Sequence, residues 1–323
     1  MFPYIVADIG GTNARFALVT AKNGGQFDIE HVQILKGANF ANFEDAFSAY
    51  ISGLDGIKPT SACVAIAGPV SQDQVTMTNL PWSFSQEAMR KQFNLDAFLA
   101  INDYTALAVA TSRLPDSGLI SILPGTRKPN GNKAILGPGT GLGVAGLVSA
   151  GDLWVPLPSE GGHTNMAPAD EYECDILKAA IKRHGHVSAE VCLSGPGLVN
   201  LYQAIADVRG EKTEALGAQD VSGRGLEGSD ALCREALDVF CGFMGTVSSN
   251  VALTYSAFGG VYITGGIIPR FPEFFKQSRF SERFLQKGIM SHFVADIPVD
   301  IVAYEQTAFL GAAAWLDQTL HQK

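Results

Sequence analysis

Residues 4–19 read YIVADIGGTNARFALV. An apolar run leads into Asp8, two glycines, Thr and Asn, and a second apolar run follows, so the pattern predicts a hairpin with a glycine turn. Paired glycines let a bulky anion such as phosphate approach several backbone N–H groups. A carboxylate repels phosphate, so Asp8 favours a hydrated Mg²⁺ between the two charges. An ordinary tight hairpin with polar turn residues is the alternative.

Residues 133–148 repeat this pattern as KAILGPGTGLGVAGLV. A third glycine turn, Gly265-Gly266, follows the apolar run 261–264. The two hairpins indicate a duplicated α/β unit whose phosphate loops face each other across a cleft. This layout resembles the superfamily of sugar kinases, heat-shock ATPases and actin, in which a turn such as Gly265-Gly266 lies under the adenine and ribose.

The composition sets outer bounds on the function. A chain of 323 residues, 46% of them hydrophobic and 17% charged, is long and apolar enough for two globular domains. The net charge of -9 argues against nucleic acid or an acidic membrane as a partner. We see no signal peptide and no apolar run long enough to span a bilayer. Five cysteines without a Cys-x-x-Cys pair indicate reduced thiols in a cytoplasmic protein.

The spacing of apolar residues predicts most remaining elements. Helices are expected at 43–51, 85–93, 171–184, 229–258 and 307–320, and strands at 27–35, 62–67, 98–102, 261–264 and 298–302. Strand–helix–strand order near the N-terminus implies a parallel pair. Residues 115–132 are expected to form a loop at a domain junction, and 207–228 an exposed loop or short helix.

Asn102 and Asp103 form a second chemical centre, where an apolar strand ends and an Ala-rich helix begins. Side chains at the carboxyl end of a parallel strand point into the ligand crevice of an open α/β sheet. Asp103 is therefore placed for chemistry. The alternative is an Asp that only caps the following helix.

Two further stretches carry polar groups. Glu160 and His163 flank two glycines, which makes a turn with two hydrogen-bonding side chains. A zinc site competes with this interpretation, although the spacing is not His-Glu-x-x-His, and a salt-bridged surface turn is the simplest alternative. Glu190 lies in the first turn of a helix that starts near residue 186 and is expected to stop at the glycine turn 195–197. The helix dipole alone favours a carboxylate there.

Other nucleotide-binding motifs fit poorly. The chain has no Gly-Lys dipeptide, so the Walker-type P-loop is absent. Residues 141–146 match the dinucleotide fingerprint, but they continue as an apolar strand instead of opening a helix. The His-Arg-Asp and Asp-Phe-Gly signatures of protein kinases are absent.

The combination and order of six short motifs point to a family resemblance. They are DIGGTN at 8–13, IND at 101–103, GTGLG at 139–143, EGGH at 160–163, HVSAE at 186–190 and LSGPG at 193–197. Together they closely resemble the bacterial glucokinases over essentially the whole chain. The resemblance implies an α/β fold of two actin-like (ribonuclease H-like) domains with a cleft between them. The smaller domain would comprise 1–112 plus 303–323, where the C-terminal helix returns, and the larger 113–302.

The resemblance also implies an activity and site residues. The activity is ATP-dependent phosphorylation of glucose at its 6-hydroxyl, with Mg²⁺, by a cytoplasmic homodimer. Asp103 resembles the catalytic base, and the sugar would be held by Asn102, Asp103, Glu160, His163 and Glu190. The nucleotide would be bound by Asp8, Ile9, Gly10, Gly11, Thr12, Asn13, Gly139, Thr140, Gly265 and Gly266, with Asp8 holding Mg²⁺ through water.

Two departures from related sequences stand out. Pro138 occupies a position where Ala is also expected in the family, and it stiffens the loop. The repressor, open-reading-frame and kinase (ROK) family often carries a Cys-x-Cys-Gly zinc motif, which this sequence lacks. We therefore expect neither a structural zinc ion nor a disulfide.

The residues support this chemistry without the family name. A sugar hydroxyl is a poor nucleophile near neutral pH, and a carboxylate base accelerates such a reaction roughly 10²–10⁴-fold. Carboxylates and amides suit a neutral polyol, because buried groups left unpaired penalise the wrong sugar. A kinase for another hexose or an acylamino sugar is one alternative. A non-catalytic actin-like or sugar-sensing ATPase is another, but it would have little use for Asn102, Asp103, Glu160 and His163.

The sequence predicts that glucose alone closes the cleft. Asn102 and Asp103 are expected on one domain and Glu160, His163 and Glu190 on the other, so the sugar would be held by both. Closure would exclude water as a competing acceptor. We expect a smaller radius of gyration by small-angle scattering with saturating glucose; an unchanged radius would contradict closure.

Overall fold

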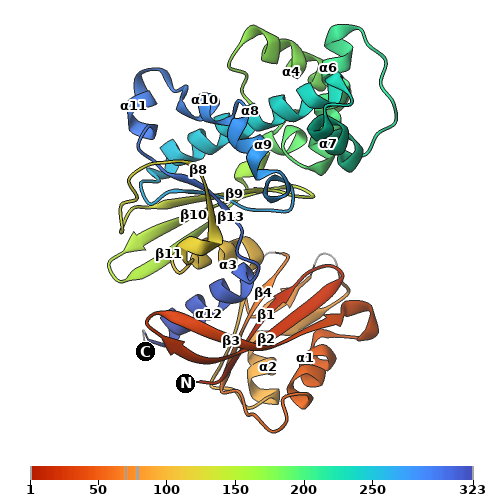
Figure 1. Cartoon of the computed structure of the whole chain (residues 1–323). Coiled ribbons are helices and arrows are strands. Elements are labelled where there is room, and N and C mark those ends of the chain that lie inside the picture. Colours follow the sequence, from red (N-terminus) through yellow and green to blue (C-terminus); the bar gives the residue numbers. More distant parts are fainter. Residues whose placement is uncertain (1, 69, 71, 78–79, 322–323) are drawn as a thin grey trace. The chain divides into compact units, whose positions relative to one another are not determined.

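The computed structural model describes every residue of the chain except 1, 69, 71, 78–79 and 322–323 (Figure 1). The chain divides into two compact units. The first comprises Met1–Pro115, Leu153–Pro156 and Tyr304–Lys323, and the second comprises Asp116–Asp152 and Leu157–Ala303. The sequence alone places 153–156 in the larger part. Each unit is described by itself below.

The first unit is built on a five-stranded sheet. Its strands, in the order β3-β2-β1-β4-β7, are β1 (Tyr4–Ile9), β2 (Asn13–Asn23), β3 (Gln26–Lys36), β4 (Ser61–Ile66) and β7 (Ala97–Asn102). The predicted glycine hairpin is confirmed, because β1 and β2 pair antiparallel with Ile9 opposite Ala14. β4 pairs parallel with both β1 and β7. The carboxyl ends of these three strands therefore meet at one edge of the sheet.

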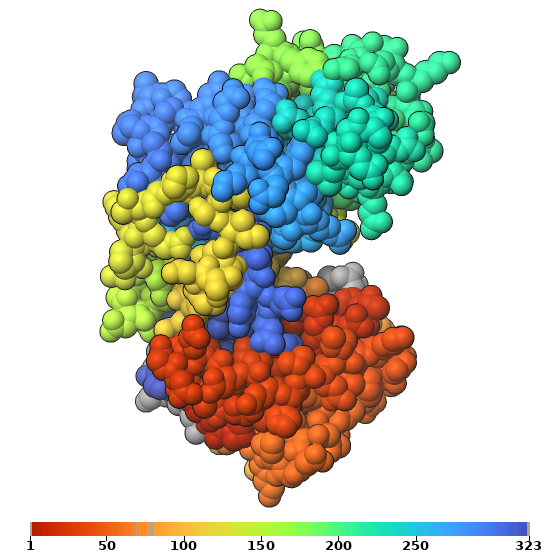
Figure 2. All heavy atoms as spheres, viewed as in Figure 1, coloured from red at the N-terminus to blue at the C-terminus, as the bar shows by residue number. Residues whose placement is uncertain are grey.

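Helices cover both faces of this sheet. They are α1 (Phe43–Ser52), α2 (Gln86–Gln92), α3 (Asp103–Ala110) and α12 (Thr307–Leu320). The strands β5 (Gln74–Thr76) and β6 (Ser83–Ser85) form a separate two-stranded sheet, whose Val75 and Phe84 belong to the core of the same unit. An aromatic cluster fills one face, with ring centroids of Phe16 and Tyr50 5.0 Å apart. Tyr4 lies on the opposite face, where its hydroxyl donates to the carbonyl of Ala313 at 3.5 Å. α12 thus packs against the N-terminal strands, as its blue atoms do in Figure 2.

The second unit repeats this strand order. Its sheet, ordered β11-β10-β9-β12-β13-β8, contains β8 (Leu119–Leu123), β9 (Lys133–Pro138), β10 (Leu142–Ala150), β11 (Leu153–Ser159), β12 (Val261–Ile263) and β13 (Val299–Val302). β9 and β10 form the second hairpin, with Pro138 opposite Leu142, and β12 pairs parallel with β9 and β13. The duplicated unit expected from the two glycine turns is confirmed.

Strand β8 corrects the expectation of a loop over 115–132. It pairs antiparallel with β13 at the edge of the sheet. The glycines and prolines around it dominate the sequence pattern, whereas the pairing with β13 comes from a segment far along the chain. A short apolar run such as LISIL becomes a strand through that long-range contact.

Helices gather around α8 in the second unit (Figure 1). They are α4 (Glu171–His184), α5 (Ala189–Cys192), α6 (Gly195–Arg209), α7 (Ala218–Glu227), α8 (Ala231–Tyr255), α9 (Pro272–Gln277), α10 (Phe280–Leu285) and α11 (Ser291–Val294). Short 3₁₀ turns occur at Gly37–Asn39, Asp116–Gly118, Gly161–His163, Ile268–Arg270 and Gly288–Met290. By length and mean hydropathy α8 could cross a membrane, but polar residues interrupt its apolar run and 83% of its most apolar window is buried inside the protein. Its apolar residues therefore form the core.

The glycine turn at 195–197 opens a helix, whereas the sequence suggested that it ends one. Ser194 caps α6, because its hydroxyl oxygen accepts the N–H of Gly197 at 3.0 Å. Pro196 is tolerated in the first turn, where no intrahelical partner for its missing N–H is needed. The helix before it, α5, is only four residues long.

We predict that Gly311→Ala strongly destabilises the first unit. A Cβ at this position of α12 would lie 1.9 Å from the carbonyl oxygen of Ala106 in α3, and backbone cannot move aside cheaply. We expect a loss of at least about 2 kcal/mol in the free energy of unfolding, measured by urea denaturation.

Gly223→Ala is the matched control, because it lies within α7 and a Cβ there meets nothing within 4 Å. We expect it to stabilise the protein by about 0.5–1 kcal/mol, as Ala replaces Gly in a helix. Equal effects of the two substitutions would show that the close contact between α12 and α3 does not limit stability.

Candidate active site

Asn102 and Asp103 lie where β7 passes into α3. Asn102 is the N-cap of α3, because its Oδ1 accepts the N–H groups of Tyr104 at 3.0 Å and Thr105 at 3.2 Å. Its Nδ2 donates to the carbonyl of Gly68 at 3.1 Å, which ties the ends of β7 and β4 together. The capping role considered for Asp103 thus belongs to Asn102. Asp103 follows as the first residue of the helix, and its Oδ1 accepts the N–H of Tyr104 at 2.8 Å.

The Asp8 and Asp103 carboxyls share the carboxyl-end edge of the first sheet. Burial raises the pKa of Asp103, and the negative charge of Asp8 raises it further, against the opposing hydrogen bond from Tyr104. Burial also raises the pKa of Asp8, although Arg15 opposes this from 3.3 Å. Because Arg15 is about half exposed, water screens much of its effect.

This edge fits a hydrated magnesium ion. Burial raises the pKa values of both carboxyls, and the half-exposed Arg15 offsets the charge of Asp8 only in part, which is a setting that a divalent cation relieves. Among the residues that the structure describes, no group of three or more His, Cys, Asp or Glu side chains is arranged to hold a metal. Mg²⁺ needs no such cage, because it commonly uses one or two carboxylates together with water and substrate phosphates.

The first glycine turn is closed by the Gly10 N–H, which donates to the carbonyl of Asn13 at 3.0 Å. The N–H of Gly37 donates to the carbonyl of Thr12 at 2.9 Å, which attaches the turn to the segment that follows β3. A Cβ on Gly10 would approach no atom closer than 3.7 Å, so folding does not demand glycine there. Room for a ligand close to the backbone is the remaining reason for this glycine.

The second glycine turn opens into a cavity of about 890 Å³. Its walls come from this turn, the N-terminus of α6, helix α7 and the turn after β12. The lining residues are Gly139, Thr140, Gly195, Pro196, Leu198, Val199, Ala218, Gln219, Ser222, Gly223, Leu226, Gly266, Ile267, Arg270 and Phe271. A mostly apolar hollow with a few polar groups suits a nucleotide base and ribose.

The structure therefore brings together Gly139, Thr140 and Gly266, which the sequence assigned to one ligand. Gly265 does not line the cavity but fixes the turn beside it, with a φ of 84° and its Cα packed against the carbonyl of Pro138. The contribution of α7, through Gln219 and Ser222, was missed. The apolar residues of 207–228 were too few to indicate that wall.

Glu160, His163 and Glu190 form a third group, in the second unit. Glu160 and His163 are joined by the 3₁₀ turn Gly161–His163, in which the His163 N–H donates to the Glu160 carbonyl at 3.0 Å. The Nδ1 of His163 lies 4.0 Å from Oε1 of Glu190. Oε2 of Glu190 accepts the N–H of Leu142 at 2.8 Å, so this carboxylate also reaches the second glycine turn.

Comparison with known proteins assigns the family. The family model described as Glucokinase matches residues 5–319. The glucokinase of Saccharophagus degradans is 58% identical over 98% of this chain and 99% of its own length. A crystal structure of glucokinase from an Antarctic psychrotroph has a TM-score of 0.95 with 40% identity and covers 100% of both chains. The chain belongs to the glucokinase family.

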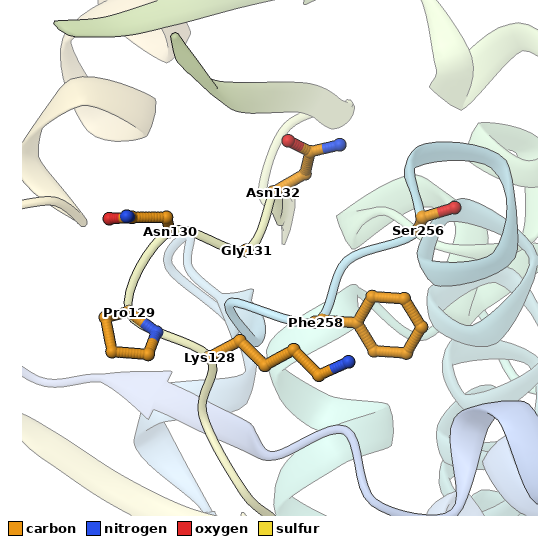
Figure 3. A pocket seen from close by; sticks show the side chains of 7 residues that line it. All are labelled: Lys128, Pro129, Asn130, Gly131, Asn132, Ser256 and Phe258. Atoms are coloured by element: carbon orange, nitrogen blue, oxygen red, sulfur yellow. The ribbon is translucent and has the colours of Figure 1, made fainter. Parts of the chain in front are cut away.

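Another hollow, of about 530 Å³, lies at the opposite end of β9 from the glycine turn (Figure 3). The Lys128 ammonium lies 4.0 Å from the ring centroid of Phe258. Figure 3 shows Asn130 and Asn132 pointing away from that pair and from each other. These polar groups therefore do not converge on one point.

We predict that Gly265→Ala weakens ATP binding far more than Gly266→Ala. At position 265 the added Cβ would lie 2.4 Å from the Pro138 carbonyl oxygen, on a backbone with a left-handed φ. At position 266 it would meet nothing within 4 Å. We expect the KM for ATP to rise at least about 10-fold in Gly265→Ala, which corresponds to about 1.4 kcal/mol.

The expected change in Gly266→Ala is smaller, within about 3-fold, since Ala adds only one methyl group to the cavity wall. Steady-state kinetics at saturating glucose measure both values. A normal KM for ATP in Gly265→Ala would show that the turn after β12 does not shape the nucleotide site.

Proposed function

We propose that Asp103 is the general base of this enzyme. As a member of the glucokinase family, it phosphorylates D-glucose at the 6-hydroxyl with ATP and gives glucose 6-phosphate and ADP. The observation that carries the proposal is the position of Asp103, a half-buried carboxyl directly after β7 whose helix-capping role is taken by its neighbour Asn102. A carboxylate that is not the N-cap of its helix and whose pKa is raised by burial is suited to accept a proton.

The proposed step is in-line transfer of the γ-phosphoryl group. The 6-hydroxyl oxygen attacks the γ-phosphorus as its proton passes to a carboxylate oxygen of Asp103, and ADP leaves on the other side. The hydrogen bond from the Tyr104 N–H holds the carboxylate in one orientation. Orientation matters because positioning supplies much of the acceleration in phosphoryl transfer.

The proposed sugar ligands are Asn102, Asp103, Glu160, His163 and Glu190. Support comes from the grouping of Glu160, His163 and Glu190 in the second unit and from the chemistry of their side chains. Carboxylates accept hydrogen bonds from sugar hydroxyls, while the His163 ring can also donate one. Asn102 donates with its amide, and its cap and its bond to Gly68 keep that amide oriented.

The proposed nucleotide site uses the Asp8 to Asn13 turn for phosphate, together with Gly139, Thr140 and the turn at Gly265 and Gly266. At positions 10, 139 and 266 the fold has room for a Cβ, so packing alone does not require glycine. This favours a role in letting a ligand come close to the backbone. The cavity of about 890 Å³ has room for adenine and ribose. The N-terminus of α6 borders it and favours negative charge.

Mg²⁺ is the proposed metal, held by Asp8 through water and by the phosphates of ATP. When bound, it neutralises charge on the transferred phosphoryl group. We also propose that the enzyme acts in the cytoplasm as a homodimer, on the basis of its family resemblance. A molar mass of one chain by light scattering at micromolar concentration would contradict the dimer.

We predict that Asp103→Asn lowers kcat by about 10²–10⁴-fold, because the amide cannot accept the proton. The acid limb of the wild-type kcat/KM profile should lie above the ordinary carboxyl pKa of 3.8, since the base must lose its proton and its pKa is raised. Activity is then lost as pH falls through the raised pKa. The limb should be absent from the residual activity of the variant.

Asp45→Asn is a control, because Asp45 is an exposed carboxylate in the first turn of another helix, α1. We expect normal turnover from it. Thermal melting and binding of an ATP analogue should show that Asp103→Asn is folded. Near-normal turnover of Asp103→Asn would leave Asp103 with a structural role only.

A further inference from the structure

Glu190 is attached to both walls of the nucleotide cavity. Its Oε2 accepts the N–H of Leu142 at 2.8 Å, at the end of the second glycine turn. Its backbone carbonyl accepts the hydroxyl of Ser194 at 2.9 Å, and Ser194 caps α6. Both Gly139 in the turn and Gly195 in α6 line the cavity. Glu190 therefore holds both the second glycine turn and the N-terminus of α6, which border the proposed nucleotide site.

The two walls are also joined directly. The N–H of Gly195 donates to the carbonyl of Gly139 at 2.8 Å, and the N–H of Gly139 donates to the carbonyl of Gly141 at 2.8 Å. These bonds and those of Glu190 close a ring through the turn, α5 and the start of α6. A shift of the Glu190 carboxylate would consequently move the turn that approaches the phosphates.

Within this ring, Gly141 lies in close contact with the Glu190 carboxylate. A Cβ on Gly141 would be 2.4 Å from Oε2 and 3.1 Å from Cδ of Glu190. Its φ is outside the left-handed region, so the backbone conformation itself does not require glycine. Space for the Glu190 carboxylate is the demand that excludes a side chain here.

We propose that Gly141 is a positioning residue and that the contact between Gly141 and Glu190 couples sugar binding to nucleotide binding. The proposal rests on the proposed role of Glu190 as a sugar ligand. When a sugar hydroxyl binds Glu190, the carboxylate is fixed, and with it the Leu142 N–H and the glycine turn. Bound sugar thereby restrains the carboxylate in the position that holds the turn, so each substrate strengthens binding of the other by the same factor.

The test measures dissociation constants by calorimetry for glucose and for a non-hydrolysable ATP analogue, the latter with and without saturating glucose. For the wild type we expect glucose to tighten binding of the analogue by roughly 5- to 150-fold, the usual range of coupling between sites. Gly141→Ala should weaken glucose binding by at least about 10-fold, because the displaced carboxylate loses a charge-assisted hydrogen bond. The same variant should reduce the coupling factor toward one.

Gly53→Ala is the control, because Gly53 lies at the end of α1, outside the proposed sites, and a Cβ there would come no closer than 3.5 Å to any atom. It should leave the dissociation constant for glucose unchanged. Gly141→Ala should still fold, since the atoms it displaces are at the end of a flexible side chain. A second pair of variants, Glu190→Gln and Glu190→Ala, reports independently: Gln keeps an oxygen for the Leu142 N–H and should retain coupling, while Ala should lose it.

The outcomes separate this proposal from the proposed function. Wild-type glucose affinity and coupling in Gly141→Ala would overturn the coupling contact, even if Glu190→Ala binds glucose poorly. Full coupling in Glu190→Ala at saturating glucose would overturn it as well. Normal glucose affinity in Glu190→Ala would remove Glu190 from the set of proposed sugar ligands, and the coupling proposal, which rests on that role, would fall with it.

Discussion

Parallel pairing of β1, β4 and β7 is the constraint on which the proposed chemistry of the first unit depends. It aligns three strand ends at one edge and brings the Asp8 and Asp103 carboxyls near enough for the charge of one to raise the pKa of the other. Separate loops would let the two charges move apart. Here the sheet keeps the two carboxyls close despite their electrostatic repulsion. The backbone hydrogen bonds of the sheet and the aromatic core on one of its faces offset the free energy of that repulsion.

The second unit uses the same strand order for a different purpose. Its hairpin turn leaves three residues between paired Pro138 and Leu142, whereas the first turn leaves four between Ile9 and Ala14. Around the shorter turn, α6, α7 and the turn at Gly265 enclose a cavity. The first unit thus supplies charge and a candidate base, and the second supplies enclosure and hydrogen-bonding groups. The two units thus share a strand order but carry different functional groups.

Much of this could be predicted from the sequence, because local patterns carry it. Both hairpins, the strand before Asn102 and the long helix α8 follow from apolar spacing and glycine pairs. The strand β8 could not be predicted, since it depends on β13 far along the chain. The cavity wall at Gln219 and Ser222 could not be predicted either, because a glycine-rich helix such as α7 is stabilised by packing against α8 and not by propensity. The contact between Gly141 and Glu190 could not be predicted either, because it joins residues 49 positions apart through the folding of α5 against the glycine turn.

Packing of α12 on the N-terminal strands has a consequence for synthesis. Tyr4 and Ala313 touch, although 309 positions separate them, and Gly311 is pressed against Ala106. A growing chain therefore leaves part of one face of the first sheet uncovered until α12 has left the ribosome. The second unit, whose segments all precede α12, can complete its core earlier. The first unit, although its strands are made before those of the second, is completed after it, so chaperones that shield apolar surface have longer access to it.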